Sequence, residues 1–235
     1  MSKNTTQCAT DRTVQLTVEN VSLVGDLRVP VAARGLVLFA HGSGSSRFST
    51  RNRYVAALLN EGGLATLLLD LLTAREEEID QVTRQLRFDI ALLAHRVVSA
   101  TDWLRQQPQL SQLPIGYFGA STGAAAALMA AAHRPAAIGA VVSRGGRPDL
   151  AANQLTQVQA PTLLIVGSDD TPVIEMNRMA LDQLHCEKEL TIVPGASHLF
   201  EEPGTLDVVA QLACHWFQCH LSDSTVQRRG MLLQE

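Results

Sequence analysis

Cysteines are few in this sequence of 235 residues, and their spacing excludes two kinds of site. The four of them stand at positions 8, 186, 214 and 219, so none forms the C-x-x-C pair of a zinc or redox centre. No cluster of histidine, aspartate and glutamate has the spacing of metal ligands either. We therefore expect reduced thiols, no bound metal and no cofactor.

Basic charge and long apolar runs are also scarce. Lysine and arginine number 19 against 23 acidic residues, the formal net charge is −4, and no basic stripe follows the chain. This excludes nucleic acid and anionic membranes as expected partners.

The apolar runs stop well short of the about 18 residues that cross a bilayer. The polar residues 1–12 lack the apolar segment of a secretory signal. We expect a cytoplasmic protein that does not bind a membrane.

What the sequence does have is apolar content, at 46% of its residues, which is ample for a buried core. No internal repeat, low-complexity tract or long linker divides the chain. We predict a single domain over residues 13–221, between polar tails at residues 1–12 and 222–235. The oligomeric state stays open, with a homodimer as one option.

Strand and helix patterns alternate along the chain. Polar and apolar residues alternate in an opening hairpin, and short continuous apolar runs typical of buried parallel strands follow it. The predicted strands cover residues 13–18, 21–29, 35–40, 64–69, 114–118, 138–143, 161–166 and 189–193. Helical spacing covers residues 51–61, 83–107, 122–133, 173–184 and 203–221.

This order of elements predicts an α/β fold. Strands that alternate with helices form right-handed crossovers, which place helices on both faces of a doubly wound, mostly parallel sheet. The opening hairpin forms an antiparallel edge. Only residues 71–82 and 144–159 could place extra structure over a site, and both segments are short. We expect little or no cap and an open pocket.

A single G-x-S-x-G pentapeptide, from Gly119 to Gly123, stands between a predicted strand and an Ala-rich predicted helix. A serine on such a sharp turn is held in a strained backbone conformation with its Oγ presented outward, and its neighbours must be small. Ser121 is therefore the candidate nucleophile. The alternative is a glycine-rich turn in which Ser121 only caps the helix.

A serine hydroxyl needs an imidazole base within hydrogen-bond reach. His198 follows the last predicted strand, at the sheet edge where α/β folds bind ligands, and is the candidate base. The alternative is an exposed loop histidine. The remaining histidines lie in or beside helices or, for His41, directly after a strand. The acid should come between the serine and the histidine in chain order, which leaves Asp169 and Asp170.

The loop that follows the strand at residues 35–40 is rich in glycine and serine. Its backbone N–H groups could point at a substrate oxygen, with a second donor from the residue after the nucleophile. The predicted oxyanion donors are the backbones of Ser43 and Thr122. A phosphate-binding loop is a weak alternative, because the loop has neither of the known glycine spacings.

Together, strand–HGSGS–helix, strand–GASTG–helix, strand–VGSDDTPV–helix and strand–PGASHLF–helix resemble the α/β-hydrolase superfamily, and within it the dienelactone-hydrolase-like proteins. The resemblance covers about residues 13–221. In that family the acid commonly lies three residues after the strand-end glycine, with a valine three residues further on. Gly167, Asp170 and Val173 match this pattern, which selects Asp170 over Asp169.

One departure from the family limits what the resemblance implies. True dienelactone hydrolases carry cysteine where this chain has Ser121, so the dienelactone substrate is not carried over. The expected function is cleavage of a carboxylic ester, or a related acyl bond, of a small or medium-sized molecule. A thioesterase, lactonase or peptidase would use the same groups, and a scaffold that keeps only the fold is the other class. The resemblance also permits association with phosphoribosyltransferase-like domains.

Arginines near the predicted site have two interpretations. Arg144 and Arg147 leave a strand at the ligand-binding edge and could bind a substrate carboxylate or phosphate. They could instead form salt bridges, with Asp149 or with Glu201 and Glu202. The same two readings apply to the arginines that follow the oxyanion loop, at positions 47, 51 and 53.

Overall fold

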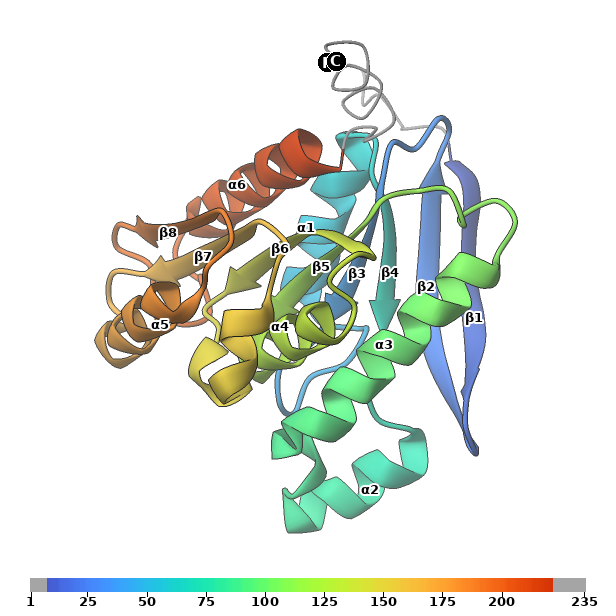
Figure 1. The fold of residues 1–235 in the computed structure, drawn as a ribbon, viewed down its shortest axis with the longest axis horizontal. Helices are drawn as coiled ribbons and strands as arrows, with labels where there is room; N and C mark the ends of the chain where they lie inside the picture. The colour runs from blue at the N-terminus through green and yellow to red at the C-terminus, as the bar shows by residue number, and fades with distance from the viewer. Residues whose placement is uncertain (1–7, 222–235) are drawn as a thin grey trace, which may run out of the picture.

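The chain opens with a long antiparallel hairpin. In the computed structural model, which describes residues 8–221, β1 (Cys8–Val18) pairs with β2 (Val21–Pro30) (Figure 1). The first strand thus begins at Cys8 and not at residue 13, so residues 8–12 belong to the sheet and the predicted N-terminal tail is wrong there. Backbone pairing such as that of Asp11 with Arg28 extends the strand through residues without apolar alternation. The predicted tail segments 1–7 and 222–235 lie outside the described residues.

The hairpin continues into an eight-stranded sheet with the order β1-β2-β4-β3-β5-β6-β7-β8. β2 pairs antiparallel with β4, and every pairing from β4 to β8 is parallel. This confirms the predicted mostly parallel sheet with an antiparallel N-terminal edge. Its parallel strands are β3 (Leu36–Ala40), β4 (Ala65–Leu69), β5 (Ile115–Ala120), β6 (Ile138–Arg144), β7 (Thr162–Gly167) and β8 (Lys188–Val193).

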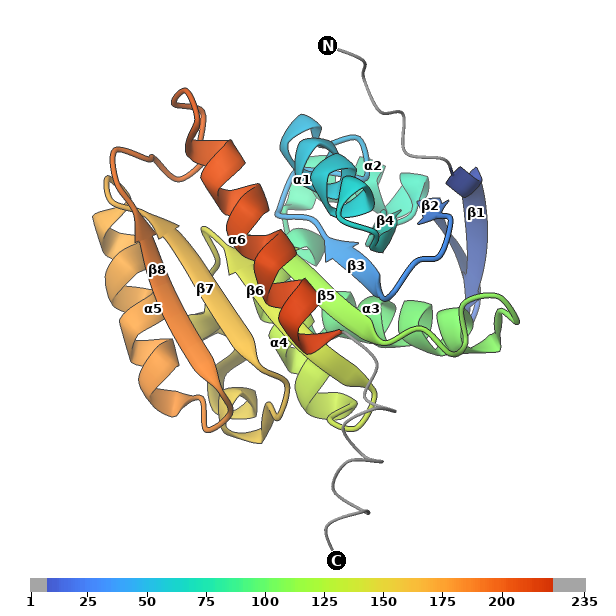
Figure 2. The same cartoon turned by 90° about the horizontal axis from the view of Figure 1, so that it is seen from above.

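Helices cover both faces of the sheet, as Figure 2 shows. One face packs against α1 (Thr50–Glu61) and α6 (Thr205–His220), around a core that includes Phe39, Phe118 and Phe217. The other face packs against α3 (Ile90–Gln106), α4 (Thr122–His133) and α5 (Thr171–Gln183). Because β3, β4, β5 and β7 are buried along their whole length, they carry continuous apolar residues.

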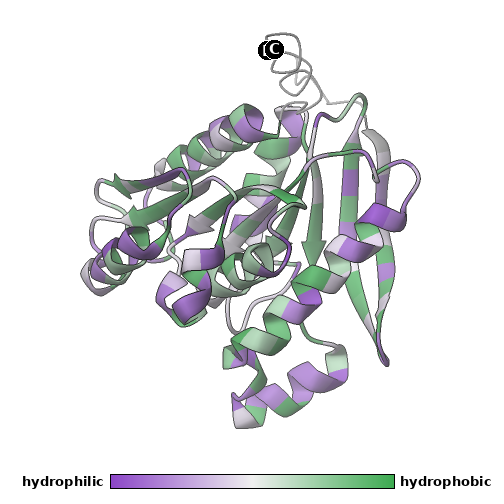
Figure 3. Ribbon diagram, viewed as in Figure 1, coloured by the Kyte–Doolittle hydropathy of each residue, from purple (hydrophilic) through white to green (hydrophobic). Residues whose placement is uncertain are grey.

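Three short elements were not predicted. They are α2 (Ala74–Thr83), the 3-10 turn η1 (Leu86–Phe88) and the 3-10 segment η2 (Pro148–Gln157). α2 is largely hydrophilic in Figure 3, so it lacks the apolar stripe that reveals a packed helix. Its start is encoded instead by a capping box, in which Thr73 and Glu76 bond each other's backbone N–H groups.

The long helix predicted over residues 83–107 is wrong at its start. Arg84 adopts a left-handed conformation (φ 55°) that ends α2. The Asp89 carboxylate then accepts a hydrogen bond from Leu92 N–H and begins α3 at Ile90. Leu86 packs against the core without belonging to α3, so its apolar character extended the helical pattern too far.

Within residues 8–221, no helix is both long and apolar enough to cross a bilayer. In the same part of the chain, Cys186, Cys214 and Cys219 form no disulfide bond. The carboxyl ends of the parallel strands share one edge of the sheet, and the loops that follow β3, β5, β6, β7 and β8 therefore gather there.

Candidate active site

Ser121 occupies a sharp turn between β5 and α4. Its backbone has φ 52° and ψ −123°, a region that costs a residue with a side chain on the order of 1–3 kcal/mol. The turn is possible because the residues two positions before and two positions after Ser121 are glycines. A Cβ on Gly119 would lie 2.4 Å from Ala124 Cα, and a Cβ on Gly123 would lie 2.2 Å from Ala40 O. The glycines of the pentapeptide therefore allow close backbone packing around a turn in which only Ser121 is partly exposed.

Backbone hydrogen bonds hold this turn against the loop after β6. Ser121 N–H donates to Arg144 O at 3.2 Å, and Arg147 N–H donates to Ser121 O at 3.1 Å. The loop after β3 approaches from the other side, where a Cβ on Gly42 would lie 3.7 Å from Ser121 Oγ. Ser121 is thus fixed between two loops at the carboxyl edge of the sheet.

His198 and Asp170 form a direct pair. The imidazole Nδ1 lies 2.6 Å from Asp170 Oδ2, with the Asp170 side chain 13% exposed and that of His198 39% exposed. A proton on Nδ1 donated to this carboxylate leaves Nε2 as the base. Asp169 differs, because its exposed carboxylate accepts a hydrogen bond from the Ser168 hydroxyl. The aspartate that contacts the histidine is therefore Asp170.

A hydrogen bond and packing contacts hold the loop that carries His198 in place. Glu202 Oε2 accepts a hydrogen bond from Ser197 N–H at 3.0 Å, and hydrogen bonding to the side chain and then the backbone of Ser197 holds the pKa of Glu202 below its ordinary value. Phe200 is buried in the core although its φ is 57°. A Cβ on Gly145 would lie 3.0 Å from His198 O, so the glycine leaves room for this loop. These supports were not predicted: Ser197, Phe200 and Glu202 are near His198 in the sequence but form no recognisable local pattern, and only the fold brings Gly145 beside it.

Ser121 and His198 both lie against the Arg144-Gly145 backbone. Among the side-chain hydrogen bonds of residues 8–221, none joins Ser121 Oγ to His198. Such bonds are often long in a free enzyme and shorten when the substrate binds. The arrangement brings a serine, an imidazole and an orienting carboxylate to one edge of the sheet, in the chain order expected for this fold.

The two predicted oxyanion donors are joined to each other. Ser43 N–H donates to the buried Thr122 hydroxyl at 2.9 Å, a bond that ties the loop after β3 to the first residue of α4. The Ser43 amide already has an acceptor, so it would have to share its hydrogen with a substrate oxygen. The sequence indicated the two backbones but not the side chain between them.

Replacing Ser43 by proline is expected to lower kcat for a p-nitrophenyl ester by about 10²–10³-fold, because proline has no amide hydrogen to donate. Ser43→Ala keeps the amide and is the matched control, with kcat close to that of the wild type. Steady-state kinetics of both variants check the prediction. A large loss in the alanine variant would show that the hydroxyl, and not the backbone, is the group that matters.

His41 supports the loop after β3 through two hydrogen bonds. Its Nδ1 lies 2.9 Å from Gly42 O, and its Nε2 accepts a hydrogen bond from Leu71 N–H at 3.0 Å. Both bonds require the neutral tautomer with its proton on Nδ1. Burial is the main reason why the pKa of His41 is lowered from its ordinary value. No sequence pattern indicated that His41 positions the loop after β3.

This lowered pKa predicts a pH dependence of stability. A histidine whose folded pKa lies below the unfolded value of about 6.5 binds its proton more readily in the unfolded chain. Its contribution is therefore complete above about pH 6.5 and is lost as the pH falls below it, at up to about 1.4 kcal/mol per pH unit. His41→Gln should flatten this slope in urea unfolding between pH 5 and 8. An unchanged slope would show that other groups cause the acid sensitivity.

The sequence and fold of this chain are similar to those of known proteins. A model of the dienelactone hydrolase family matches residues 30–221. The chain belongs to this family. A dienelactone hydrolase from Anabaena variabilis, known from a crystal structure, is 62% identical, with a TM-score of 0.90, and the match covers 92% of this chain and 99% of that one. The chain thus has the α/β-hydrolase fold.

Other relatives of this dienelactone hydrolase family member differ in length or in sequence. A protein of two Mycobacterium tuberculosis strains is 57% identical to this chain over 211 residues. It is provisionally named a phosphoribosyl transferase. The match covers 90% of this chain and 47% of that protein, so the chain spans about half the length of these curated relatives. Est1E from Butyrivibrio proteoclasticus, at 15% identity and a TM-score of 0.75 over 88% of this chain and 98% of its own, shares the fold.

A small cavity lies beside the loop after β3 of this family member. Residues of that loop line it together with Leu72, Glu77, Arg87 and Leu93 from the α2–α3 region. Arg87 is held there by hydrogen bonds to the buried Asp80, whose pKa the arginine lowers. A larger hollow between β1, β2 and α1 contains neither the serine nor the histidine. The short α2 and η1 therefore line this side of the site.

The two arginines predicted as substrate ligands have different surroundings. Arg147 donates through Nε and Nη2 to both oxygens of Asp149, at 2.9 and 2.8 Å, which is the salt-bridge alternative. Arg144 is buried and pairs with no carboxylate within residues 8–221. After the loop that follows β3, Arg47 pairs with Asp70 and Asp26, and Arg53, in α1, also pairs with Asp26.

Proposed function

We propose that this hydrolase cleaves carboxylic esters of small or medium-sized molecules, with Ser121 as nucleophile, His198 as base and Asp170 as the orienting acid. The observation that carries the proposal is the 2.6 Å contact between His198 Nδ1 and Asp170 Oδ2, on a loop that lies against the same Arg144-Gly145 backbone as the Ser121 turn. Family membership supports the hydrolase class. The local geometry supports the assignment of roles.

The proposed reaction has two halves. His198 Nε2 takes the Ser121 hydroxyl proton while Oγ attacks the ester carbonyl carbon, and backbone N–H groups of Ser43 and Thr122 stabilise the oxyanion. The tetrahedral intermediate collapses, and the alcohol leaves with the proton from His198. Water then loses a proton to His198 and attacks the acyl-enzyme, which releases the acid and restores Ser121.

A set of serine, histidine and aspartate suits ester hydrolysis in general. The alternatives that use the same machinery are a thioesterase, a lactonase and a peptidase, which differ in pocket contacts and not in the reacting groups. A non-catalytic scaffold is the other class. Against a scaffold stands the retained strain at Ser121, since a turn without a nucleophile has no need of a residue with a side chain at φ 52°.

The name of the Mycobacterium tuberculosis relative is not carried over to this chain. It describes a protein of about twice the length, of which this chain matches 47%. The matched part carries the dienelactone hydrolase pattern. Phosphoribosyl transfer would need groups beyond those that the hydrolase geometry uses.

Stopped-flow hydrolysis of p-nitrophenyl butyrate tests the proposal. Acylation of Ser121 releases p-nitrophenol before the acyl-enzyme reacts with water, so we expect a burst equivalent to the enzyme concentration, followed by a slower steady rate. The same assay with a butyryl thioester and a butyryl anilide ranks the alternative bonds. A faster reaction with either would replace the ester assignment, and no turnover of any of the three would favour the scaffold.

A further inference from the structure

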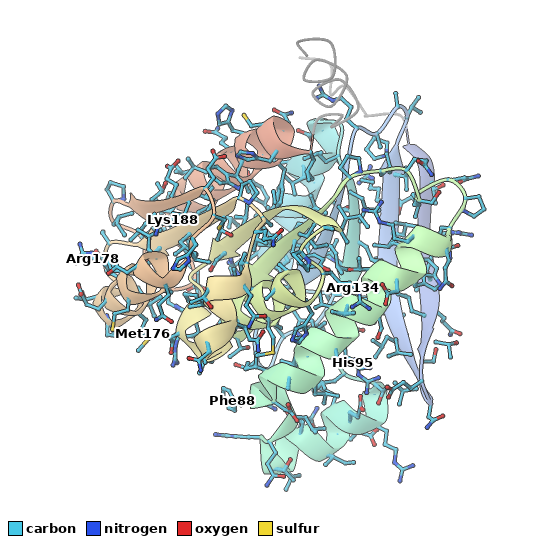
Figure 4. The ribbon with its side chains drawn as sticks, viewed as in Figure 1. Phe88, His95, Arg134, Met176, Arg178 and Lys188 are labelled. Atoms are coloured by element: carbon cyan, nitrogen blue, oxygen red, sulfur yellow. The ribbon has the colours of Figure 1, made fainter. Side chains whose placement is uncertain are left out.

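Asn177 lies in the second turn of α5, and its side chain is fully buried. Its Nδ2 donates two hydrogen bonds, to Gly146 O at 2.9 Å and to Val173 O at 2.8 Å. Both acceptors are carbonyl oxygens, so they fix the orientation of the amide. Figure 4 labels its neighbours Met176 and Arg178 at the outer edge of the molecule. Asn177 faces the other way and ties α5 to the loop after β6.

The two bonds of Asn177 differ in what they join. The bond to Val173 stays within α5, whereas the bond to Gly146 crosses 31 positions of the chain. Within residues 8–221, Asn177 Oδ1 has no hydrogen-bond partner, and a buried amide oxygen without a partner destabilises the folded protein. An apolar residue of similar size would avoid this cost. The feature that only the amide supplies is the link to Gly146.

Gly146 belongs to the β6 loop, which we define as residues 144–147. This loop exchanges two backbone hydrogen bonds with Ser121, at 3.2 and 3.1 Å, and Gly146 lies between the two loop residues that make them. The preceding residue, Gly145, lies against the base, since a Cβ there would be 3.0 Å from His198 O. A shift of Gly146 would therefore move the nucleophile relative to the base.

The acid and the base are held together by contacts of their own. Besides the bond between His198 and Asp170, the backbone N–H of Asp169 donates to Ala196 O at 3.0 Å, which joins the two loops that carry the pair. Asp170 is also the residue that begins α5, the helix of Asn177. The acid and the base thus form one unit connected to α5, and the nucleophile turn forms a second unit with the β6 loop.

We propose that Asn177 is a positioning residue, which keeps the nucleophile unit and the acid–base unit at their working distance through its bond to Gly146. Within the described part of the chain, no other side chain of α5 forms a hydrogen bond to the β6 loop. The inference rests on the proposed function, in which it gives Asn177 a role without contact to the substrate. A misplacement of about 1 Å between reacting groups can lower a rate by about 10²-fold.

Asn177→Leu tests this role, because leucine keeps much of the volume and removes the donor. We expect kcat for p-nitrophenyl butyrate to fall by about 10²-fold and KM to stay within about twofold, since Asn177 does not bind the substrate. The thermal midpoint should fall by a few degrees, because Gly146 O loses its partner. The kinetics are measured well below the thermal midpoint of each variant.

Asn60→Leu is the matched control. Asn60 is also buried, and its Nδ2 donates to Leu64 O at 2.9 Å and to Thr66 Oγ1 at 3.0 Å. It lies near the end of α1, beside the start of β4 and at the opposite edge of the sheet from the site. We expect a similar loss of thermal midpoint with kcat unchanged. An equal loss of kcat in Asn60→Leu and Asn177→Leu would overturn the inference.

Asn177→Ser separates the two bonds and keeps the test open if the leucine variant does not fold. A serine hydroxyl inside a helix bonds the carbonyl four residues earlier, so this variant keeps the bond to Val173 and loses the one to Gly146. We expect kcat to fall by about 10²-fold again. A wild-type kcat in this variant would show that the bond to Gly146 is not needed, and the inference would be wrong.

Proton NMR adds a readout that does not depend on turnover. The downfield signal of the proton between His198 Nδ1 and Asp170 should be absent in His198→Ala and should persist in Asn177→Leu, because that pair has its own contacts. Loss of the signal in folded Asn177→Leu would overturn the inference, since Asn177 would then act on the acid–base pair itself. Retained activity in Ser121→Ala would instead contradict the proposed function.

Discussion

Replacing Ser121 by alanine is expected to lower kcat for p-nitrophenyl butyrate by about 10⁶-fold, the size of the loss when a serine protease loses its nucleophile. The variant has no hydroxyl that His198 could activate. Its fold should persist, because alanine keeps the Cβ and the same backbone requirement at φ 52°, so the thermal midpoint should stay within a few degrees. Active-site titration and steady-state kinetics measure the loss.

Ser111→Ala is a matched control for this loss. Ser111 lies in the turn before β5, at the edge of the sheet opposite to Ser121, and its substitution should leave kcat unchanged. If Ser121→Ala keeps activity within about tenfold of the wild type, another group must attack the substrate. The serine-hydrolase proposal would then be wrong.

Asp170→Asn is expected to lower kcat by about 10⁴-fold with the fold intact. The amide group donates where the carboxylate accepts, which imposes the wrong tautomer on the imidazole, as in a serine-protease triad. The contact of 2.6 Å between Asp170 Oδ2 and His198 Nδ1 makes this substitution a direct test of how the histidine is oriented. Kinetics across pH 5 to 9 separate loss of the base from loss of the fold.

Asp169→Asn is the control that the chain offers at the next position. Its exposed carboxylate bonds the Ser168 hydroxyl and not the imidazole, so we expect a far smaller effect on kcat. An inactive Asp169→Asn beside an active Asp170→Asn would transfer the role of the acid to Asp169. The nucleophile and the base would keep their assignments.

The sequence predicts the sheet well because buried parallel strands have a distinctive pattern. Continuous apolar runs and the strand–GASTG–helix order are local signals, and each corresponds to an element or turn of the structure. The sharp turn at Ser121 could be expected from its glycines alone, since their spacing reflects close backbone packing. The contact of His198 with Asp170 follows from the shared sheet edge and the family pattern.

Other features depend on contacts that no local pattern encodes. α2 has few apolar residues and is recognisable only by its capping box. The bond from Ser43 N–H to Thr122 Oγ1 joins residues 79 positions apart. Arg144 and Arg147 read alike in the sequence, yet one is buried without a carboxylate and the other is paired with Asp149. Only the three-dimensional surroundings distinguish a surface salt bridge from a buried cation.

Reaction with a fluorophosphonate probe tests the central claim most directly, because the probe forms a covalent bond only with an activated serine. Mass spectrometry of the labelled protein should show one adduct, on the peptide that contains Ser121, and labelling should become much slower in His198→Ala. An unlabelled protein, or an adduct on another serine with Ser121 unmodified, would contradict the account.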